Sequence, residues 1–143
     1  MSMKSELRPT QQTQEVSDKE LQSVIADFLE MGHVENIVAM FKQDRRYYAW
    51  VGKLLEDERF AVRLGVSVLF EYLIEQKPGD LHLALPSLAK ALQHATPWVR
   101  GEAASVLALI GSAEALNLVK SLENDPAREV ASLVRDILQE QII

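Results

Sequence analysis

The sequence predicts an all-α protein, built as a right-handed α-solenoid of about four antiparallel helix pairs in one domain. Leu, Ala and Val dominate an apolar share of 48%, and only 6 Gly and 5 Pro interrupt 143 residues, so the composition favours helices over strands. Apolar residues recur at helical spacing along most of the chain. A helix–turn–helix pattern also repeats with its apolar positions in register, which indicates stacked helical units.

The repeat is clearest where a short polar turn leads into a helix. Three residue pairs each begin such a helix: Val62-Arg63, Val99-Arg100 and Val130-Ala131. The positions three, six and seven residues beyond the second member of each pair are all apolar: Val66, Ala103 and Val134; Leu69, Val106 and Ile137; Phe70, Leu107 and Leu138. The first two units are 37 residues apart and the last is offset by 31. Units of this kind bury their faces against their neighbours.

The chain begins with a polar segment, residues 1–16, with too few apolar side chains to offset the entropy of ordering it. We expect this segment to be a flexible tail. Ser17 and Glu20 then form a capping-box pattern that starts the first helix, and Gly32 suits the left-handed residue that ends it. Residues 17–45 lack the turn pattern of the repeat, so we expect two helices there that cap the exposed face of the first unit.

Breakers and caps divide the remaining chain into three repeated units. Lys77-Pro78-Gly79-Asp80 and Asn124-Asp125-Pro126 break helices, and Pro97 fits the first turn of a helix because that position needs no N–H. We expect repeats over residues 46–77, 78–111 and 112–143. The helices expected from the second onward cover residues 34–42, 46–56, 60–76, 81–93, 97–110 and 113–123, and then the stretch from the last break to Ile143.

Charge and composition narrow the classes of function. The formal net charge of −6 argues against a general role on nucleic acid or on an anionic membrane. The chain has no Cys, which removes disulfides, thiolate nucleophiles and Cys-bound metals. Met1–Thr10 lacks the apolar run of a secretory signal, and no stretch approaches the roughly 20 apolar residues of a membrane span. We therefore expect a soluble cytoplasmic protein.

The middle unit carries a family pattern in its turn and helix residues. In chain order the pattern consists of Leu85-Pro86, Leu88 and Leu92, then Thr96-Pro97-Trp98-Val99-Arg100, then Ala103-Ala104, Leu107 and Ile110-Gly111. This arrangement resembles HEAT repeats, in particular the short armadillo-like variety named after phycobilisome lyase subunits. The resemblance covers residues 46–143 and implies the stacked helical fold. It implies less about function, because the family includes scaffolds, lyase subunits and nucleic-acid binders.

The same family pattern places an Asp six residues before an Arg, which is the spacing between Asp57 and Arg63. Asp125 occupies the corresponding place in the last unit. Two positions depart from the pattern: His94 stands at the Asp position of the middle unit, and Ala131 stands at the Arg position of the last unit. We therefore expect the ladder of Asp–Arg contacts typical of such repeats to be incomplete.

The titratable and nucleophilic residues form no catalytic constellation in the sequence. His33, His82 and His94 are scattered, and none has a second His or a carboxylate cluster at the spacing of metal ligands. The serines lack the context of a nucleophile elbow, and there is no glycine-rich phosphate loop. We expect no catalytic, metal-binding or cofactor-binding residues and no enzymatic activity. The alternative is a lyase-like or glycosylase-like member of the fold.

The helix over residues 60–76 is apolar on more than one face. Once its core positions are assigned, Leu64, Val68 and Tyr72 remain at a spacing of four, and such a helix must be covered on a second side. The helix over residues 97–110 meets this region with residues too small to protrude: Gly101, Ala104, Ser105 and Ala108. Second helices line the concave face of HEAT-like stacks, so these residues are candidates for a shallow groove that holds a partner or a second subunit.

Polar residues at the rim of this groove are expected to orient the partner: Glu71, Glu75, Arg135 and Gln139. The alternative is that the N-terminal segment covers the helix over residues 60–76. In that case Gly101 and Ala104 only permit close packing between helices. Trp98 is expected to pack beneath a repeat turn.

The sequence thus favours a non-catalytic scaffold that binds a protein partner, or a second copy of itself, through its concave face. One alternative is a lyase-type, cofactor-handling subunit resembling the phycobilin lyase proteins, which requires an apolar pocket of several hundred Å³. Another alternative is nucleic-acid binding through basic and aromatic residues: Arg45, Arg46, Arg59 and Arg63, with Tyr47, Tyr48 and Trp50. Tyr48 shares a helical stripe with Val51 and Leu55, which favours a core role for it instead.

Overall fold

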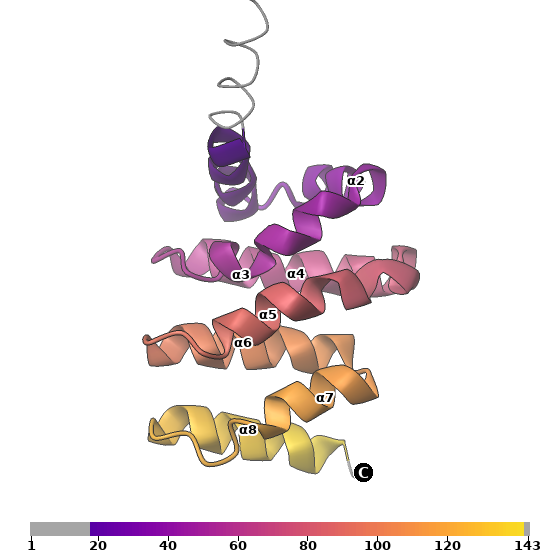
Figure 1. The fold of residues 1–143 in the computed structure, drawn as a ribbon. Helices are drawn as coiled ribbons and strands as arrows, with labels where there is room; N and C mark the ends of the chain where they lie inside the picture. The colour runs from indigo at the N-terminus through magenta and orange to yellow at the C-terminus, as the bar shows by residue number, and fades with distance from the viewer. Residues whose placement is uncertain (1–17, 142–143) are drawn as a thin grey trace, which may run out of the picture.

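The computed structural model of the protein describes residues 18–141, and every regular element in that range is helical (Figure 1). After a first helix over residues 18–30, the elements are α2 (Val34–Gln43), η1 (Arg45–Trp50), α3 (Val51–Leu54), α4 (Phe60–Gln76), η2 (Pro78–Ala84), α5 (Leu85–Ala91), α6 (Pro97–Ile110), α7 (Ala113–Lys120) and α8 (Arg128–Glu140). The predicted all-α class is confirmed, because residues 18–141 contain no strand. The predicted tail, the Ser17 cap and the end of the chain at Ile143 lie outside the described residues.

The elements lie in successive layers that follow the order of the chain (Figure 1). The longer helices α4, α6 and α8 pack side by side in that order, and α3 packs against α5. Each short helix also contacts the longer helix that follows it, as α5 contacts α6 and α7 contacts α8. The connecting turns between short and long helices gather along one edge of the molecule.

Two predicted helices begin differently from the expectation. The segments expected to be helical over residues 46–56 and 81–93 each start as a 3₁₀-helix, η1 or η2, and continue as the short α3 or α5. Pro78, predicted to break the chain, begins η2 because the first turn of a helix has no use for its missing N–H. Tyr48 of η1 and Val51, three residues further on at the start of α3, both lie in the core and are 0% exposed. The last helix ends at Glu140.

The predicted register of apolar residues forms the core. Of the nine positions that repeat between units, eight are buried and Leu138 is half-buried. Leu88 and Leu107, in the middle unit, are both 0% exposed. Gly32 ends the first helix with φ of 83°, and Gly111 ends α6 with φ of 70°, so both occupy the left-handed region that glycine adopts without strain.

Two glycines, whose role the sequence did not indicate, lie where neighbouring layers leave no room for a Cβ. A Cβ on Gly65 of α4 would lie 2.7 Å from Cβ of Leu29 in the first helix. A Cβ on Gly52 of α3 would lie 2.6 Å from the backbone oxygen of Ser87, whose Oγ accepts a hydrogen bond from the Gly52 N–H at 2.7 Å. At Gly101, by contrast, the nearest atom would be Cδ2 of Leu133 at 3.6 Å, an ordinary contact.

Candidate functional site

The turn before each long helix is held by one recurring hydrogen bond. The backbone N–H of Arg59 donates to Oδ1 of Asp57 at 2.9 Å, and that of Ala127 donates to Oδ1 of Asp125 at 2.8 Å. In both cases the donor follows the Asp by two residues. In the middle unit the N–H of Thr96 donates to Nδ1 of His94 at 3.0 Å. His94 thus performs the same capping role as the Asp that it replaces in the repeat pattern. Because Nδ1 of His94 accepts the hydrogen bond from the Thr96 N–H, Nδ1 carries no proton in this arrangement.

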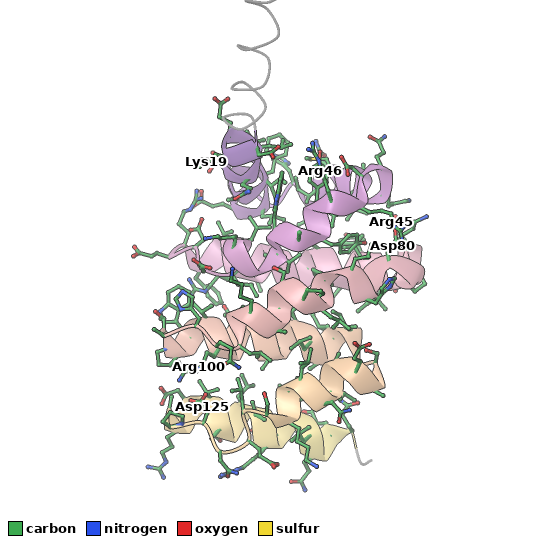
Figure 2. The ribbon with its side chains drawn as sticks, in the orientation of Figure 1. Lys19, Arg45, Arg46, Asp80, Arg100 and Asp125 are labelled. Carbon is green, nitrogen blue, oxygen red and sulfur yellow. The ribbon has the colours of Figure 1, made fainter. Side chains whose placement is uncertain are left out.

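Two of these turns are each connected to the next layer by an arginine, Arg63 in one case and Arg100 in the other. Nη1 of Arg63 donates to the carbonyls of Asp57 and Glu58, at 2.8 and 3.0 Å, and Nε donates to Glu102 of α6 at 2.8 Å. Arg100 repeats this arrangement one unit later, with two carbonyls of its own turn and the carboxylate of Asp125 in the next layer (Figure 2). The arginine therefore binds the backbone of its own turn, and its carboxylate partner belongs to the following unit.

The series stops in the last unit, as Ala131 at the arginine position predicts. Arg135, one helical turn further along α8, supplies part of the missing contact. Its Nε donates to the carbonyl of Glu123 at 3.0 Å and Nη2 donates to Oδ1 of Asn124 at 3.2 Å. Both acceptors belong to the turn of the same unit, so Arg135 joins no further layer.

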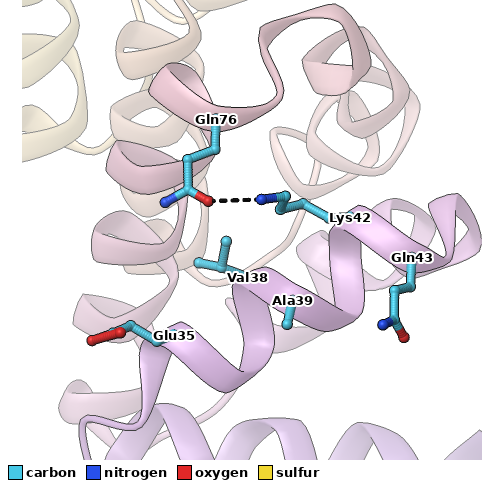
Figure 3. Close-up of a pocket in the computed structure, with 6 residues that line it drawn as sticks. All are labelled: Glu35, Val38, Ala39, Lys42, Gln43 and Gln76. Atoms are coloured by element: carbon cyan, nitrogen blue, oxygen red, sulfur yellow. Dashed lines mark hydrogen bonds between the residues drawn. The ribbon is translucent and has the colours of Figure 1, made fainter.

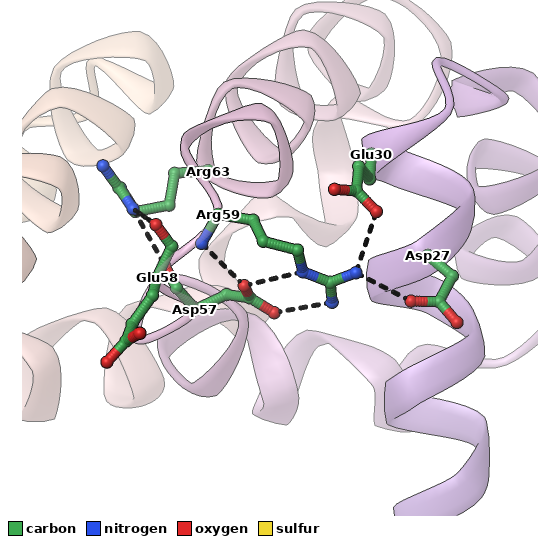
Figure 4. Close-up of polar contacts among 6 residues, drawn as sticks. All are labelled: Asp27, Glu30, Asp57, Glu58, Arg59 and Arg63. Carbon is green, nitrogen blue, oxygen red and sulfur yellow. Dashed lines mark hydrogen bonds and ion pairs between the residues drawn. The ribbon is translucent and has the colours of Figure 1, made fainter.

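Arg59 attaches the first helix to the repeated part of the chain (Figure 4). Its guanidinium bonds both carboxylate oxygens of Asp57, at 3.0 and 2.9 Å, and reaches Asp27 and Glu30 of the first helix at 2.9 Å each. The hydrogen bond to Asp57, then that to Asp27, raises the pKa of Arg59 above its ordinary value. The hydrogen bond from Arg59 in turn holds the pKa of Asp57 below its ordinary value.

The arginines considered for nucleic-acid binding are all engaged by carboxylates. Besides Arg59 and Arg63, Arg45 pairs with Asp80 at 3.2 Å, and Arg46 pairs with Asp44 at 2.9 Å (Figure 2). The neighbouring tyrosines are in the core: Tyr47 is 8% exposed and Tyr48 is 0% exposed. Burial raises the pKa of Tyr48 to about 12. The predicted core role of Tyr48 is confirmed, and the four arginines lie in two places, η1 and the start of α4.

The predicted surface residues separate into an exposed group and a buried group. Leu64 is 52% exposed and Tyr72 is 39% exposed on α4, and Val68 between them is half-buried and packs against the core. Glu71, Glu75, Arg135 and Gln139 are exposed, while Ser105 and Ala108 are half-buried. Gly101 and Ala104 are buried, so their assignment to an open groove is wrong. Their side of α6 faces neighbouring helices, as the contact between Gly101 and Leu133 of α8 shows.

Two aromatic residues that the sequence analysis did not assign to this surface extend it. Phe60, four residues before Leu64 and therefore in the same row of α4, is 62% exposed. Trp98, predicted to pack beneath a turn, remains 39% exposed at the start of α6. The guanidinium carbon of Arg63 lies 4.3 Å from the centre of the Trp98 ring and 5.5 Å from that of Phe60. The residues Phe60, Leu64, Val68 and Tyr72 with Trp98 are called the apolar strip below.

Two hollows of the surface share no lining residue with the apolar strip. One, of about 360 Å³, is lined by α2 and the end of α4, where Nζ of Lys42 donates to Oε1 of Gln76 at 3.1 Å (Figure 3). A larger one, of about 540 Å³, lies over the short helices α3 and α5 and includes Lys53, Lys90 and His94 in its wall. The walls of both hollows combine polar and apolar side chains.

Two further findings concern residues 18–141 as a whole. Within this range, no group of three or more His, Asp or Glu side chains is arranged so that it could hold a metal ion. None of the helices in the same range combines the length and apolar character needed to cross a lipid bilayer. Comparisons of the chain with protein-family models, with curated proteins and with solved structures find no match.

Proposed function

We propose that the protein is a non-catalytic interaction module that binds a protein partner through the apolar strip. The observation that carries this proposal is the distribution of exposed hydrophobic side chains. Six large ones are exposed within residues 18–141, and four of them lie on α4 and at the start of α6: Phe60, Leu64, Tyr72 and Trp98. Grouped exposed apolar side chains mark interaction surfaces, whereas scattered ones need no explanation.

The chemistry of the strip fits a protein partner. Tyr and Trp are the residue types that contribute most to binding when they enter a partner's surface. Trp98 is held in place by the guanidinium of Arg63, which is itself fixed by two carbonyls and by Glu102. A side chain fixed in this way loses little conformational freedom when a partner binds.

In this proposal the strip belongs to the second-helix face of a right-handed, HEAT-like α-solenoid. The ordered contacts of α4 with α6 and of α6 with α8 support a stack of repeated units. The equivalent bonds made by Arg63 and Arg100, and by Asp57 and His94, support units that share one turn structure.

The decisive variant is Leu64→Glu, because Leu64 is exposed and its replacement leaves the core unchanged. We expect Leu64→Glu to keep the melting temperature of the wild type and to lose the partner proteins that the wild type captures. Asn117→Glu, which adds the same charge at an exposed position of α7, should retain them. Val68→Glu is less informative, since Val68 packs against the core and a buried carboxylate destabilises the fold by itself. Equal capture by the wild type and Leu64→Glu would refute the proposal.

A further inference from the structure

We propose that the partner is an amphipathic helix of about three turns whose apolar side is bordered by lysine or arginine. This inference rests on the proposed function and specifies the chemistry of the partner. Three properties of α4 and α6 lead to it: the sign of their free charges, the length of the apolar strip, and the kind of backbone that can lie on it.

The free charges beside the strip on α4 are carboxylates. Glu71 and Glu75 are exposed on the same side of the helix as Leu64, and neither forms an ion pair within residues 18–141. The single basic residue of α4 is Arg63, whose side chain is only 13% exposed and already bonds Glu102. An approaching cation therefore meets two uncompensated negative charges along this helix.

The neighbouring α6 adds no free positive charge. Its single basic residue, Arg100, has a side chain that is 13% exposed and bonds the carboxylate of Asp125. Glu102, the acidic residue of α6, keeps 26% of its side chain exposed while it pairs with Arg63. Around the strip the two helices therefore present carboxylates and no unpaired base, and charge complementarity selects a basic partner.

The dimensions of the strip suit a short helix. Phe60 and Tyr72 are 12 residues apart on α4, which at about 1.5 Å per residue gives a strip of about 18 Å. Its members follow one another at intervals of four residues, as do the apolar residues along one side of a partner helix. A helix of about 12 residues covers this length.

A helix also suits the strip better than an extended peptide. Residues 18–141 contain no strand, so the described part of the chain has no sheet edge to which an extended peptide could add. An extended peptide on α4 would contact side chains only, and its own backbone N–H and C=O groups would remain without protein partners. A helix satisfies its backbone internally and offers one apolar side to Leu64 and its neighbours.

A phage-displayed library of random peptides about 16 residues long tests this proposal on the full-length protein. The library samples acidic, basic, neutral polar and apolar residues and proline at its positions, so its composition does not presuppose the charge of the peptides that bind. We expect the sequences retained by the wild type and lost with Leu64→Glu to carry apolar residues three and four apart, with lysine or arginine beside them. Acidic or proline-rich sequences that depend on Leu64 would overturn the chemistry of the partner and leave the proposed function intact. If no retained sequence depends on Leu64, both proposals fail.

Titration of the most enriched peptide then isolates the contribution of charge, with the tryptophan fluorescence of the protein, from Trp50 and Trp98, as the signal. Between about 50 and about 500 mM salt, we expect the affinity of the wild type to fall by about tenfold or more. The double variant Glu71→Gln, Glu75→Gln should bind more weakly at low salt and respond little to added salt. The matched control, Glu35→Gln with Glu114→Gln, removes two exposed carboxylates from α2 and α7 and should behave as the wild type. Equal salt dependence of peptide binding by the wild type and by the double variant Glu71→Gln, Glu75→Gln overturns the proposal.

If the apolar strip is occupied by the N-terminal segment of the chain or by a second copy of the protein, binding and sedimentation measurements give different results. Residues 1–17 include Met3, Lys4, Leu7 and Arg8, which have the chemistry proposed for the partner. If removal of these 17 residues raises the affinity for the peptide about tenfold, the protein's own N-terminal segment occupies the strip and the proposal is overturned. Concentration-dependent dimerisation that Leu64→Glu abolishes would identify a second copy and overturn it as well. We expect unchanged affinity and a monomer in sedimentation velocity.

Discussion

The guanidinium of Arg100 meets the carboxylate of Asp125 side-on, with Nε–Oδ2 and Nη2–Oδ1 distances of 2.9 and 2.8 Å. The Asp125 side chain is only 2% exposed, and its Oδ1 also accepts the Ala127 N–H at 2.8 Å. The hydrogen bond from Arg100, the largest cause, holds the pKa of Asp125 below its ordinary value. This pair joins the middle unit to the last across 25 residues of chain.

Asp125→Asn tests this pair through the pH dependence of stability. Asparagine keeps an oxygen for the Ala127 N–H but loses the charge, so we expect a loss of about 1–3 kcal/mol at neutral pH. Because the folded pKa is lowered, the stabilising contribution is complete above the unfolded value of about 3.9 and is lost as the pH falls through the folded pKa. The difference between the wild type and Asp125→Asn in urea unfolding should therefore shrink below about pH 4. The exposed Asp136→Asn should show no such difference, and a pH-independent difference at Asp125 would contradict the assignment.

Two glycine substitutions should have opposite effects. Gly65→Ala places a Cβ 2.7 Å from Cβ of Leu29, so the first helix must shift and the free energy of unfolding should fall by about 1–3 kcal/mol. In Gly101→Ala the new Cβ on α6 would lie 3.6 Å from Cδ2 of Leu133 and 4.0 Å from Cγ2 of Val130, both ordinary contacts. The better helix propensity of alanine should therefore raise the free energy of unfolding by about 0.5–1 kcal/mol. Urea unfolding of both variants measures the contrast. Similar values for the two would show that the first helix does not approach α4 as closely as described.

Truncations in the middle unit should be among the most destabilising single changes. Leu88 and Leu107 are both fully buried between neighbouring layers, so Leu88→Ala and Leu107→Ala should each cost about 2–5 kcal/mol. Leu64→Ala removes the same atoms from an exposed site and should cost less than about 0.5 kcal/mol. Costs below about 1 kcal/mol at both buried positions would contradict the assignment of the core.

Arg59 should control the local stability of the first helix. Arg59→Gln removes the contacts to Asp27 and Glu30, so amides of residues 18–30 should exchange with deuterium faster, while those of α6 keep the wild-type rate. Arg135→Gln, which removes an arginine whose bonds remain within the last unit, should leave exchange in the first helix unchanged. Identical exchange in residues 18–30 for the wild type and Arg59→Gln would show that apolar packing alone attaches this helix.

The sequence predicted the helices whose ends carry local signals. The bounds of α4, Phe60 to Gln76, agree with the prediction because a polar turn precedes it and the Lys77-Pro78 break follows it. The 3₁₀ segments η1 and η2 were not predicted, because apolar spacing over one or two turns does not distinguish three residues per turn from 3.6. The two 3₁₀ segments pack against each other, a contact between distant parts of the chain that local spacing does not reveal.

The candidate surface was predictable only in part. Leu64 and Tyr72 stand out because they are large, apolar and outside the core stripe of α4, and they are exposed. Small residues give no such signal, since Gly101 and Ala104 suit both an open surface and a buried position between helices, and both are buried. The pair of Arg63 and Glu102 is separated by 39 residues, and only the stacking of α4 on α6 brings the two together.

The ion pairs along the turns give the molecule a preferred way to bend. Arg59 with Asp27, Arg63 with Glu102 and Arg100 with Asp125 connect successive layers along a single edge. Separation of two layers at this edge requires that a guanidinium leave its carboxylate. At the opposite edge the Arg45–Asp80 pair joins η1 to η2, and the layers beyond η2 are held there by apolar contacts and surface polar groups. We therefore expect the layers beyond η2 to separate more readily at the edge opposite the turns.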